Sequence, residues 1–361
     1  MAGKSPKLPK GGIRPRPAVI AMQPYSPPTG GRSGKLRLDF NENTVGCSPR
    51  VIEAIRQGVG PEGLAVYPEY GDPKAAIARY FRVDPEQFVF TNGTDEAIQV
   101  FVNTYVDDHQ EVVTLKPAYA MYRFYAEVAG AKVTEVPYPL PDMEFPLDAV
   151  LNAITPETRA VLLANPNNPT GTAVSLEGIA RILRKARKAA VLIDEAYYEF
   201  SGITALPEIA HAPNLFVCRT FSKVFGMAAM RLGCLFSHAA NIQYLHKAQS
   251  PYSVNMLAVM AAQAAVEDTA YVQQYVAEAL AARELLSIGL ERLGIHYVPS
   301  SANFVLGRFG ARAIEVRDAL RDKGILVRDR SYEAPGCVRI TVGTREQTRQ
   351  LLAALEEVWN R

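Results

Sequence analysis

The sequence predicts an α/β protein built on a mostly parallel sheet with helices on both faces, followed by a smaller α+β domain. From about residue 60 to 250, short apolar runs alternate with helical patterns, which is typical of parallel sheets. After Pro251 an Ala- and Leu-rich stretch covers residues 254–295, and mixed segments follow, which indicates a change of domain. The expected strands contain QFVFT, EVVTL, AKVTEV, RAVLLA, AAVLIDE and LFVC, then NFVLGRF and CVRITVG.

Composition narrows the class of protein. A chain of 361 residues with 48% hydrophobic residues can bury one large core or two unequal ones. The formal charge of +2 argues against a nucleic-acid partner, and no run of 18 apolar residues predicts a membrane span. The first 35 residues lack the apolar core of a secretory signal, so we expect a cytoplasmic protein. Four isolated cysteines are expected to be reduced and mostly packed: Cys47, Cys218, Cys234 and Cys337.

The chain divides into three predicted regions. Residues 1–35 are rich in Pro, Gly, Lys and Arg, and the first acidic residue is Asp39, so we expect a flexible basic tail. We expect a large domain over residues 61–250 and a small domain from residues 36–60 and 251–361. The 254–295 stretch is too long for one globular helix without a break. The five histidines form no zinc-type cluster with cysteine, and no metal site is predicted.

Polar residues follow the expected strands of the large domain, at the carboxyl ends where open parallel sheets bind ligands. In TNGTDEAI, Gly93 permits a tight turn, and Thr94 and Asp95 begin a helix that either binds a phosphate or has an ordinary cap. In NPNNPTG, two prolines and a glycine fix the direction of Asn168. Asp194 follows a strand buried on both faces, so we expect a cationic partner for its carboxylate.

A lysine completes this group of residues. Lys223 follows LFVCRTFS, and Thr220, Ser222 and Arg231 surround it in the sequence. A lysine among cationic and apolar neighbours has a lowered pKa and can form a Schiff base. A cofactor with an aldehyde, a phosphate and a basic ring nitrogen would use the lysine, the buried acid, the amide and the anion-binding groups together. The residues therefore predict pyridoxal 5'-phosphate as the cofactor.

At these residues the sequence resembles the fold-type I pyridoxal-phosphate aminotransferases of class I and II, and among them most closely the histidinol-phosphate aminotransferases. The resemblance covers about residue 36 to the C-terminus. It is carried by DFNEN, YPEYGDPKAAIARY, TNGTDEAI, KPAYAMY, NPNNPTG, DEAYYEF, RTFSKVFGMAAMRLG, SSANFVL and VRITVGT. The combination of NPNNPTG, DEAY and SK eight residues before an arginine is highly specific for the superfamily.

The resemblance implies a role for each cofactor residue. Lys223 would form the imine with the cofactor and later move the proton at the substrate Cα. Asp194 would keep the pyridine nitrogen protonated, Tyr197 and Asn168 would bind the ring hydroxyl oxygen, and Tyr119 would stack on the ring. The phosphate would be held by backbone amides of Thr94 and Asp95, by Thr220, Ser222 and Arg231, and by Tyr67 of the second subunit of a homodimer.

The resemblance also implies the substrates of a histidine-biosynthesis enzyme, with histidinol phosphate as amino donor and 2-oxoglutarate as acceptor. Arg339, assisted by Arg328 and Asn303, would bind the acidic end of the substrate, and Asn43 lies in the segment expected to close over it. One arginine site can accept a carboxylate and a phosphate because its planar fork suits both. Departures from the family pattern weaken the choice of substrate: Thr44, Val45, Cys47, Ala228 and Ala229.

Three alternatives stay open. An aromatic amino-acid aminotransferase and a threonine-phosphate decarboxylase would share the fold and use the same lysine. A sensor that binds the cofactor without turnover belongs to a different class. Such regulators usually carry a fused DNA-binding helix-turn-helix, which 35 Pro- and Gly-rich residues cannot form.

Overall fold

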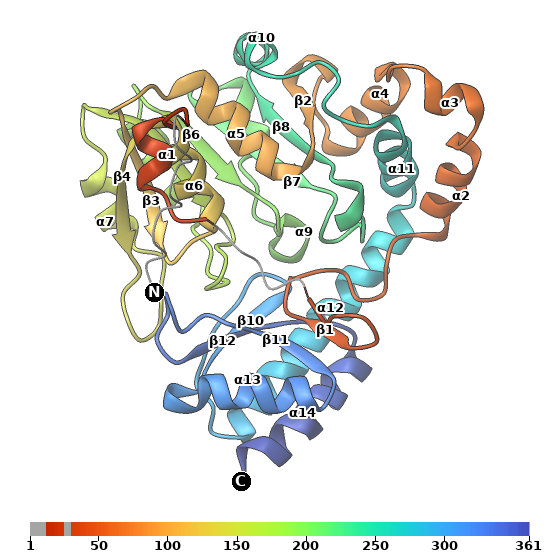
Figure 1. Ribbon diagram of the computed structural model, residues 1–361, viewed down its shortest axis with the longest axis vertical. Coiled ribbons are helices and arrows are strands. Elements are labelled where there is room, and N and C mark those ends of the chain that lie inside the picture. The colour runs from red at the N-terminus through yellow and green to blue at the C-terminus, as the bar shows by residue number, and fades with distance from the viewer. Residues whose placement is uncertain (1–11, 25–29, 361) are drawn as a thin grey trace.

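The structure is a computed structural model that describes residues 12–24 and 30–360, and it has two lobes (Figure 1). The large lobe is built on a seven-stranded sheet. Its strands are β2 (Phe88–Thr91), β3 (Glu111–Lys116), β4 (Lys132–Pro137), β5 (Thr158–Ala164), β6 (Ala190–Asp194), β7 (Leu215–Thr220) and β8 (Gly233–Ser237).

The strand order of this sheet is β2-β8-β7-β6-β5-β3-β4. β8 is antiparallel to both of its neighbours, β2 and β7, whereas the pairs β3–β4, β3–β5, β5–β6 and β6–β7 are parallel. The carboxyl ends of β2, β3, β5, β6 and β7 therefore share one edge, as the sequence predicts for a mostly parallel sheet.

Both faces of this sheet are buried. In β5, Val161 and Leu163 pack into one core cluster, whereas Ala160 and Leu162 pack into another on the opposite face. This alternation explains why the strands read as continuous apolar runs. The first face packs against α4 (Gly71–Phe81), α7 (Leu147–Ala153) and α8 (Leu176–Lys185), and the second against α5 (Gly93–Tyr105), α6 (Ala120–Ala129) and α10 (Ala239–Ala248). The short helix α9 (Tyr198–Ser201) follows β6.

The small lobe holds a five-stranded sheet with the order β1-β11-β12-β10-β9. Its strands are β1 (Leu36–Leu38), β9 (Tyr297–Val298), β10 (Phe304–Arg308), β11 (Ile325–Asp329) and β12 (Cys337–Thr341). α13 (Ala313–Asp322) and α14 (Arg345–Trp359) lie on this sheet and share a core with Val305, Val338 and Ile340. In the register of β11 and β12, Arg328 lies opposite Arg339.

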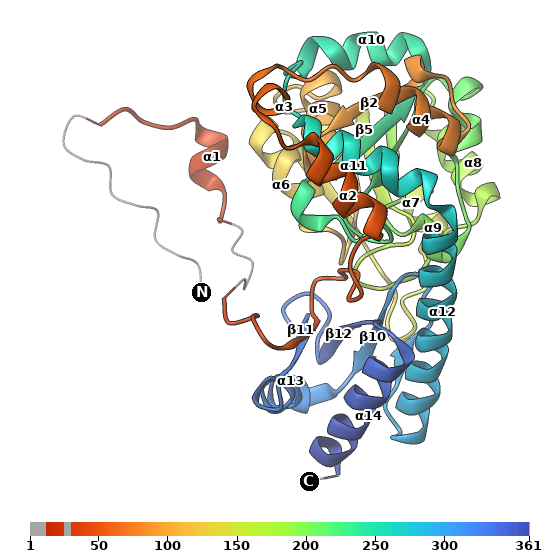
Figure 2. The same cartoon turned by 90° about the vertical axis from the view of Figure 1, so that its right-hand side faces the viewer.

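A long helix joins the two lobes. The Ala-rich stretch breaks at Asp268 into α11 (Met256–Glu267) and α12 (Thr269–Arg292), and the Asp268 side chain accepts a hydrogen bond from the backbone N–H of Tyr271. Tyr275 in the first half of α12 belongs to the large-lobe core, and Leu286 in the second half belongs to the small-lobe core. Figure 2 shows α12 extending from the large lobe along the small one.

The packing differs from the domain limits expected from the sequence. α2 (Pro49–Gly58) and α11 were expected in the small domain, but they contact each other, α11 also contacts α4, and Val51 and Ala258 lie in the large-lobe core. The connection from α2 to α4 contains α3 (Pro61–Ala65). Apolar residues at 51 and 258 explain the difference, because they join the core cluster that holds Ile77 of α4 and Phe88 of β2 rather than the cluster of α13 and α14.

The expected N-terminal tail is described in part. Residues 1–11 and 25–29 lie outside the described residues. Residues 12–24 include α1 (Pro17–Ala21), which lies against α6. Within the described ranges, no helix is long and apolar enough to cross a membrane. All four cysteines are free thiols, and Cys218, Cys234 and Cys337 are buried.

Candidate active site

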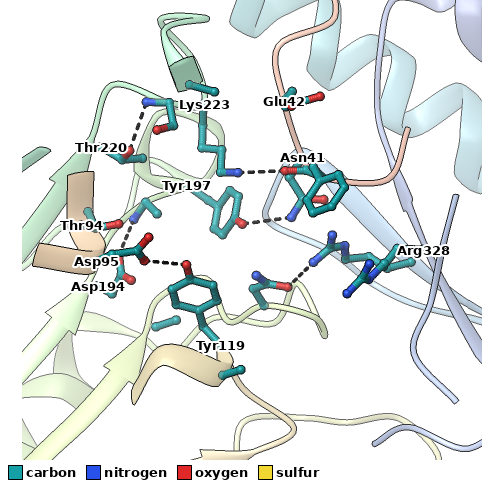
Figure 3. A pocket seen from close by; sticks show the side chains of 18 of the residues that line it. Asn41, Glu42, Thr94, Asp95, Tyr119, Asp194, Tyr197, Thr220, Lys223 and Arg328 are labelled. Carbon is teal, nitrogen blue, oxygen red and sulfur yellow. Dashed lines mark hydrogen bonds between the residues drawn. The ribbon is translucent and has the colours of Figure 1, made fainter. Parts of the chain in front are cut away.

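A cavity of about 530 Å³ opens at the carboxyl edge of the large sheet, and the small lobe supplies its opposite wall (Figure 3). Its polar lining comes from the segment after β1, from segments that follow β2, β3, β5, β6 and β7, and from β11 and β12. The structure brings twelve of the predicted site residues together here: Thr94, Asp95, Tyr119, Asn168, Asp194, Tyr197, Thr220, Ser222, Lys223, Arg231, Arg328 and Arg339.

Lys223 extends from the loop after β7 into this cavity. The turn before it is fixed by the Thr220 hydroxyl, which accepts a hydrogen bond from the backbone N–H of Ser222 at 3.0 Å. Nζ of Lys223 donates to the carbonyl oxygen of Phe40, 2.9 Å away in the small lobe. Burial and the nearby Arg339 guanidinium lower the pKa of the Lys223 ammonium to about 8. A substantial fraction of this lysine is therefore a neutral nucleophile near pH 8.

Asp194, at the end of β6, is 3% exposed. Its carboxylate accepts hydrogen bonds from the Tyr122 hydroxyl at 2.7 Å and from the Ala196 backbone N–H at 3.1 Å. Within residues 12–24 and 30–360 no Lys, Arg or His forms an ion pair with Asp194, so the cationic partner expected from the sequence is not a side chain of this part of the chain. Burial raises the pKa of Asp194, and the neutral donors around it act in the opposite direction.

Two hydrogen bonds connect the lobes across the cavity. The Tyr197 hydroxyl accepts from Nδ2 of Asn41 at 2.9 Å, and Oδ1 of Asn168 accepts from Nη1 of Arg339 at 2.5 Å. Burial is the main cause that raises the pKa of Tyr197, which keeps its hydroxyl protonated at neutral pH. Figure 3 shows the Tyr197 hydroxyl directed at Asn41 beside Lys223, and Asn168 lines the same cavity.

An anion-binding corner lies at the start of α5. Arg231 points its guanidinium at this corner, with Nη1 3.5 Å from the Ser222 hydroxyl and Nη2 3.3 Å from the Asp95 carboxylate. β8 reaches the corner because Gly233 has no side chain: a Cβ there would lie 2.9 Å from the backbone nitrogen of Thr94. Free N–H groups of the helix start, hydroxyls and a guanidinium are the groups that bind a phosphate.

The small-lobe wall is strongly basic. Arg339 is buried and donates from Nη2 to the carbonyl oxygen of Asp39 at 2.7 Å, so its hydrogen bonds go to neutral oxygens. Burial and the neighbouring Arg330 and Arg328 lower the pKa of Arg339 to about 10. Arg328 lies over the Phe40 ring, 5.5 Å from its centroid. In the part of the chain that the structure describes, no carboxylate forms an ion pair with Arg328 or Arg339, and Glu333, which lies within electrostatic reach of both, pairs with Arg330. These two guanidinium groups favour an anionic ligand between the lobes.

Three predicted residues lie outside the cavity lining. Tyr67 is 72% exposed and lies beside Tyr252, with ring centroids 4.5 Å apart. Asn303 donates from Nδ2 to the carbonyl oxygen of Asn41, behind the lining. Asn43 uses its amide locally, since Nδ2 donates to the Val224 carbonyl and Oδ1 accepts from the N–H groups of residues 45 and 46. Asn43 therefore anchors its loop beside Lys223 and does not face the cavity.

Sequence reasoning did not assign a role to several polar and aromatic lining residues, namely Phe40, Asn41, Glu42, Tyr122 and Arg330. Tyr122 stands three residues after Tyr119, and that helical spacing was the available signal. Phe40 and Asn41 lie in the quoted DFNEN motif. Arg330 alternates with Arg328 along the end of β11, and its guanidinium pairs with Glu333.

The family and its relatives agree with this geometry. The family model for class I and II aminotransferases matches residues 33–355. A histidinol-phosphate aminotransferase from Halalkalibacterium halodurans is 36% identical over 95% of this chain and 96% of its own length. Its counterpart from Roseiflexus castenholzii is 36% identical over 95% of this chain and 97% of its own length. The chain belongs to the class I and II aminotransferase family, which confirms the predicted class of enzyme.

Solved structures give the same fold. The histidinol-phosphate aminotransferase from Sinorhizobium meliloti, in complex with pyridoxal-5'-phosphate, has a TM-score of 0.87 and 27% identity, and the match covers 96% of this chain and 98% of that one. A mutant aspartate aminotransferase from Thermus thermophilus has a TM-score of 0.82 and 26% identity, with 96% of this chain and 100% of that chain covered. The predicted fold type is therefore confirmed.

Proposed function

We propose that this protein is a pyridoxal-phosphate-dependent aminotransferase that moves an amino group between histidinol phosphate and 2-oxoglutarate. The observation that carries the proposal is the position of Lys223, a lysine of lowered pKa between a buried acid and a basic anion site in one cavity. The relatives named histidinol-phosphate aminotransferase match almost the whole chain, which supports this donor over an aromatic amino acid.

The residues fit pyridoxal phosphate at three points. Lys223 suits the aldehyde, and the corner formed by Thr94, Ser222 and Arg231 suits the phosphate. Asp194 suits the ring nitrogen, because a buried carboxylate without a cationic side-chain partner is completed by a protonated ring. When bound, the cofactor supplies an electron sink for the charge left at the substrate Cα.

The chain itself supplies binding and proton transfer. The Lys223 amine would take the proton from the substrate Cα and return it to the aldehyde-derived carbon of the cofactor, on the other side of the nitrogen that joins them. Asp194 would hold a proton on the ring nitrogen, and Tyr197 and Asn168 would hold the ring hydroxyl oxygen. The small lobe contacts the same wall of the cavity, because the Phe40 carbonyl accepts from Lys223 and Asn41 donates to the Tyr197 hydroxyl.

Arg339 and Arg328 are proposed to bind the anionic end of each substrate. They lie opposite each other on adjacent strands, so both guanidinium groups project from one face of the small sheet. A phosphate dianion gains more from two uncompensated cations than a single carboxylate does, which supports histidinol phosphate as donor. Glutamate and 2-oxoglutarate would use the same pair through a carboxylate.

We also propose a homodimer that shares its active sites. Tyr67 and its ring neighbour Tyr252 are exposed, and so are Val59, Leu64 and Val66, which are close to Tyr67 in the sequence. An isolated chain rarely exposes such a group of residues, and a second copy would cover it. The Tyr67 hydroxyl would then donate to the cofactor phosphate of the neighbouring subunit.

A panel of amino donors tests the substrate. Histidinol phosphate, histidinol, phenylalanine, tyrosine and threonine phosphate would each be offered with 2-oxoglutarate, and glutamate and carbon dioxide would be measured. Fastest glutamate release from histidinol phosphate supports the proposal. A clear preference for phenylalanine or tyrosine favours the aromatic alternative, and carbon dioxide from threonine phosphate favours the decarboxylase.

A further inference from the structure

The carboxylate of Asp194 has an unusual set of partners for a buried acid. Oδ2 accepts from the Tyr122 hydroxyl at 2.7 Å, and Oδ1 accepts from the Ala196 backbone N–H at 3.1 Å. The Cys218 thiol, on the neighbouring strand β7, is a third donor to this carboxylate. Each of these groups is neutral, so in the protein alone the negative charge of Asp194 depends on hydrogen bonds rather than on a cation.

Tyr122 is placed to be the strongest of these donors. It is 1% exposed, and its ring packs edge-on against Tyr119 with centroids 5.7 Å apart, so the position of the hydroxyl is fixed. A phenolic O–H bound to a carboxylate is a charge-assisted bond, whereas a thiol is a weak donor. Tyr119, one helical turn earlier, donates in the same way to Asp95 at 2.6 Å.

We propose that Tyr122 is a positioning residue that holds the Asp194 carboxylate ionised and directed at the ring nitrogen of the cofactor. The inference rests on the proposed function, because it assigns Asp194 the task of keeping that nitrogen protonated. Tyr122 lines the cavity, but its hydroxyl is committed to Asp194, so it acts through the acid. Without this bond the carboxylate keeps one weak side-chain donor and one backbone donor.

The groups around Asp194 shift the pKa of its carboxyl in opposite directions. Burial and the Asp95 carboxylate raise the pKa of Asp194, whereas Tyr122, Cys218 and the Ala196 N–H lower it. The pKa of Tyr122 itself lies well above 10, mainly because of burial and then because of Asp194. Tyr122 therefore stays protonated and remains a donor over the whole working pH range. Tyr197 also faces Asp194 through the cavity, and its raised pKa keeps it neutral.

The test is Tyr122→Phe, which removes a single oxygen, with Tyr138→Phe as the matched control. Tyr138 is a buried tyrosine outside the cavity lining. The dissociation constant of pyridoxal phosphate from the apoprotein is expected to rise roughly ten- to hundredfold in Tyr122→Phe and to stay unchanged in Tyr138→Phe. With the acid less able to protonate the ring nitrogen, kcat is expected to fall and KM to change little.

A spectroscopic titration separates positioning from a structural role. The visible absorbance of the lysine-bound cofactor changes as a proton leaves the nitrogen that joins it to Lys223. A less positive ring nitrogen makes that proton harder to remove, so the midpoint should move upward by about half to one pH unit in Tyr122→Phe. Because Tyr122 acts through Asp194, adding Tyr122→Phe to Asp194→Asn should change neither the midpoint nor the dissociation constant further.

The outcomes are distinct. A wild-type protein that fails to bind pyridoxal phosphate contradicts the proposed function itself. If the wild-type protein binds pyridoxal phosphate but Tyr122→Phe has the same midpoint and affinity as Tyr138→Phe, the proposed role of Tyr122 is wrong and the proposed function is unaffected. If Tyr122→Phe does not fold, Tyr122→Leu replaces it with Tyr138→Leu as control, and an equal midpoint and affinity in these two variants would contradict the inference.

Discussion

Nζ of Lys223 donates a hydrogen bond to the carbonyl oxygen of Phe40 at 2.9 Å, so the reactive lysine of the large lobe is bonded directly to the first segment of the small lobe. The same segment supplies Asn41 to the Tyr197 hydroxyl and the Asp39 carbonyl to Arg339. The hydrogen bonds that hold the two lobes together are therefore also the ones that position the site residues. Loss of these hydrogen bonds should therefore change both the packing of the lobes and the position of Lys223.

The buried Lys223 ammonium should destabilise the apoprotein at neutral pH. Its pKa is lowered from 10.5 to about 8, so the folded state binds fewer protons than the unfolded state between these values. The contribution of Lys223 to the free energy of unfolding is most favourable above pH 10.5, where the lysine is neutral in both states. It becomes less favourable as the pH falls, and is fully lost below pH 8. Lys223→Met should make the apoprotein more stable at pH 7 by on the order of 1–3 kcal/mol, allowing for screening by water in the cavity.

Urea unfolding of apoprotein at several pH values measures this effect. The stability difference between Lys223→Met and wild type should shrink between pH 8 and 10.5. Lys247→Met, a change of an exposed lysine, is the control and should show no such trend. A pH-independent difference would mean that Lys223 titrates in the folded protein as it does in the unfolded chain.

The second prediction concerns the anionic end of the donor. Loss of a charge-assisted contact should cost about 2–4 kcal/mol, so kcat/KM for histidinol should be roughly 30- to 1,000-fold below that for histidinol phosphate. Arg328→Met should remove much of this preference, whereas Arg349→Met, at an exposed position on α14, should not. Steady-state kinetics with histidinol phosphate and with histidinol measures this preference in each variant. If the two variants prefer histidinol phosphate over histidinol to the same extent, the phosphate of the donor does not bind at Arg328.

The third prediction concerns the shared site. Lys223→Ala chains and Tyr67→Ala chains, mixed so that subunits exchange, should form heterodimers in which one site carries both defects and the other is intact. Activity should then rise above that of either variant alone. Failure to rise, in a sample where heterodimers are shown to form, would mean that Tyr67 serves only its own subunit. A protein that sediments as a monomer at micromolar concentration would remove the basis of the proposal.

The fourth prediction concerns a buried ion pair behind the site. Nη2 of Arg219 lies 2.7 Å from Oε2 of Glu195, and both side chains are at most 2% exposed. They follow Cys218 and Asp194, so the pair ties together the two strand ends that carry the cavity residues. Arg219→Met leaves Glu195 buried without a cation and should cost about 3–5 kcal/mol of unfolding free energy.

Arg123→Met is the control for this pair, because Arg123 and Glu127 form an exposed ion pair one helical turn apart. Its loss should cost about 0–1 kcal/mol. Urea unfolding at pH 7 compares the two variants. Similar losses would show that burial adds nothing to the importance of the Arg219 pair.

The sequence allowed most of the large lobe to be predicted, because buried strands appear as continuous apolar runs and polar residues follow them. It did not predict that β8 runs antiparallel, since the short run GCLFS begins directly after the Arg231 loop. The assignment of α2 and α11 to the small domain differed from the packing, because residues near a lobe boundary can bury against either sheet.

The sequence predicted the site residues that directly follow individual strands, but it did not predict the contacts between them. The loops that carry Asn168 and Lys223 converge because parallel strands share an edge. The bonds from Asn41 to Tyr197 and from Tyr122 to Asp194 join residues 156 and 72 positions apart, so they depend on how the lobes and helices pack. The sequence did not predict the neutral donors to Asp194, because one is the Tyr122 hydroxyl on a packed helix and the other is the backbone N–H of Ala196.

The most direct test of the central claim is a paired assay of wild type and Lys223→Ala with pyridoxal phosphate, histidinol phosphate and 2-oxoglutarate. Glutamate release and visible absorbance are recorded in the same samples. The wild-type protein is expected to absorb in the visible and to form glutamate, and Lys223→Ala is expected to do neither, because nucleophile and proton carrier are one group. Substantial glutamate release by Lys223→Ala would contradict the account.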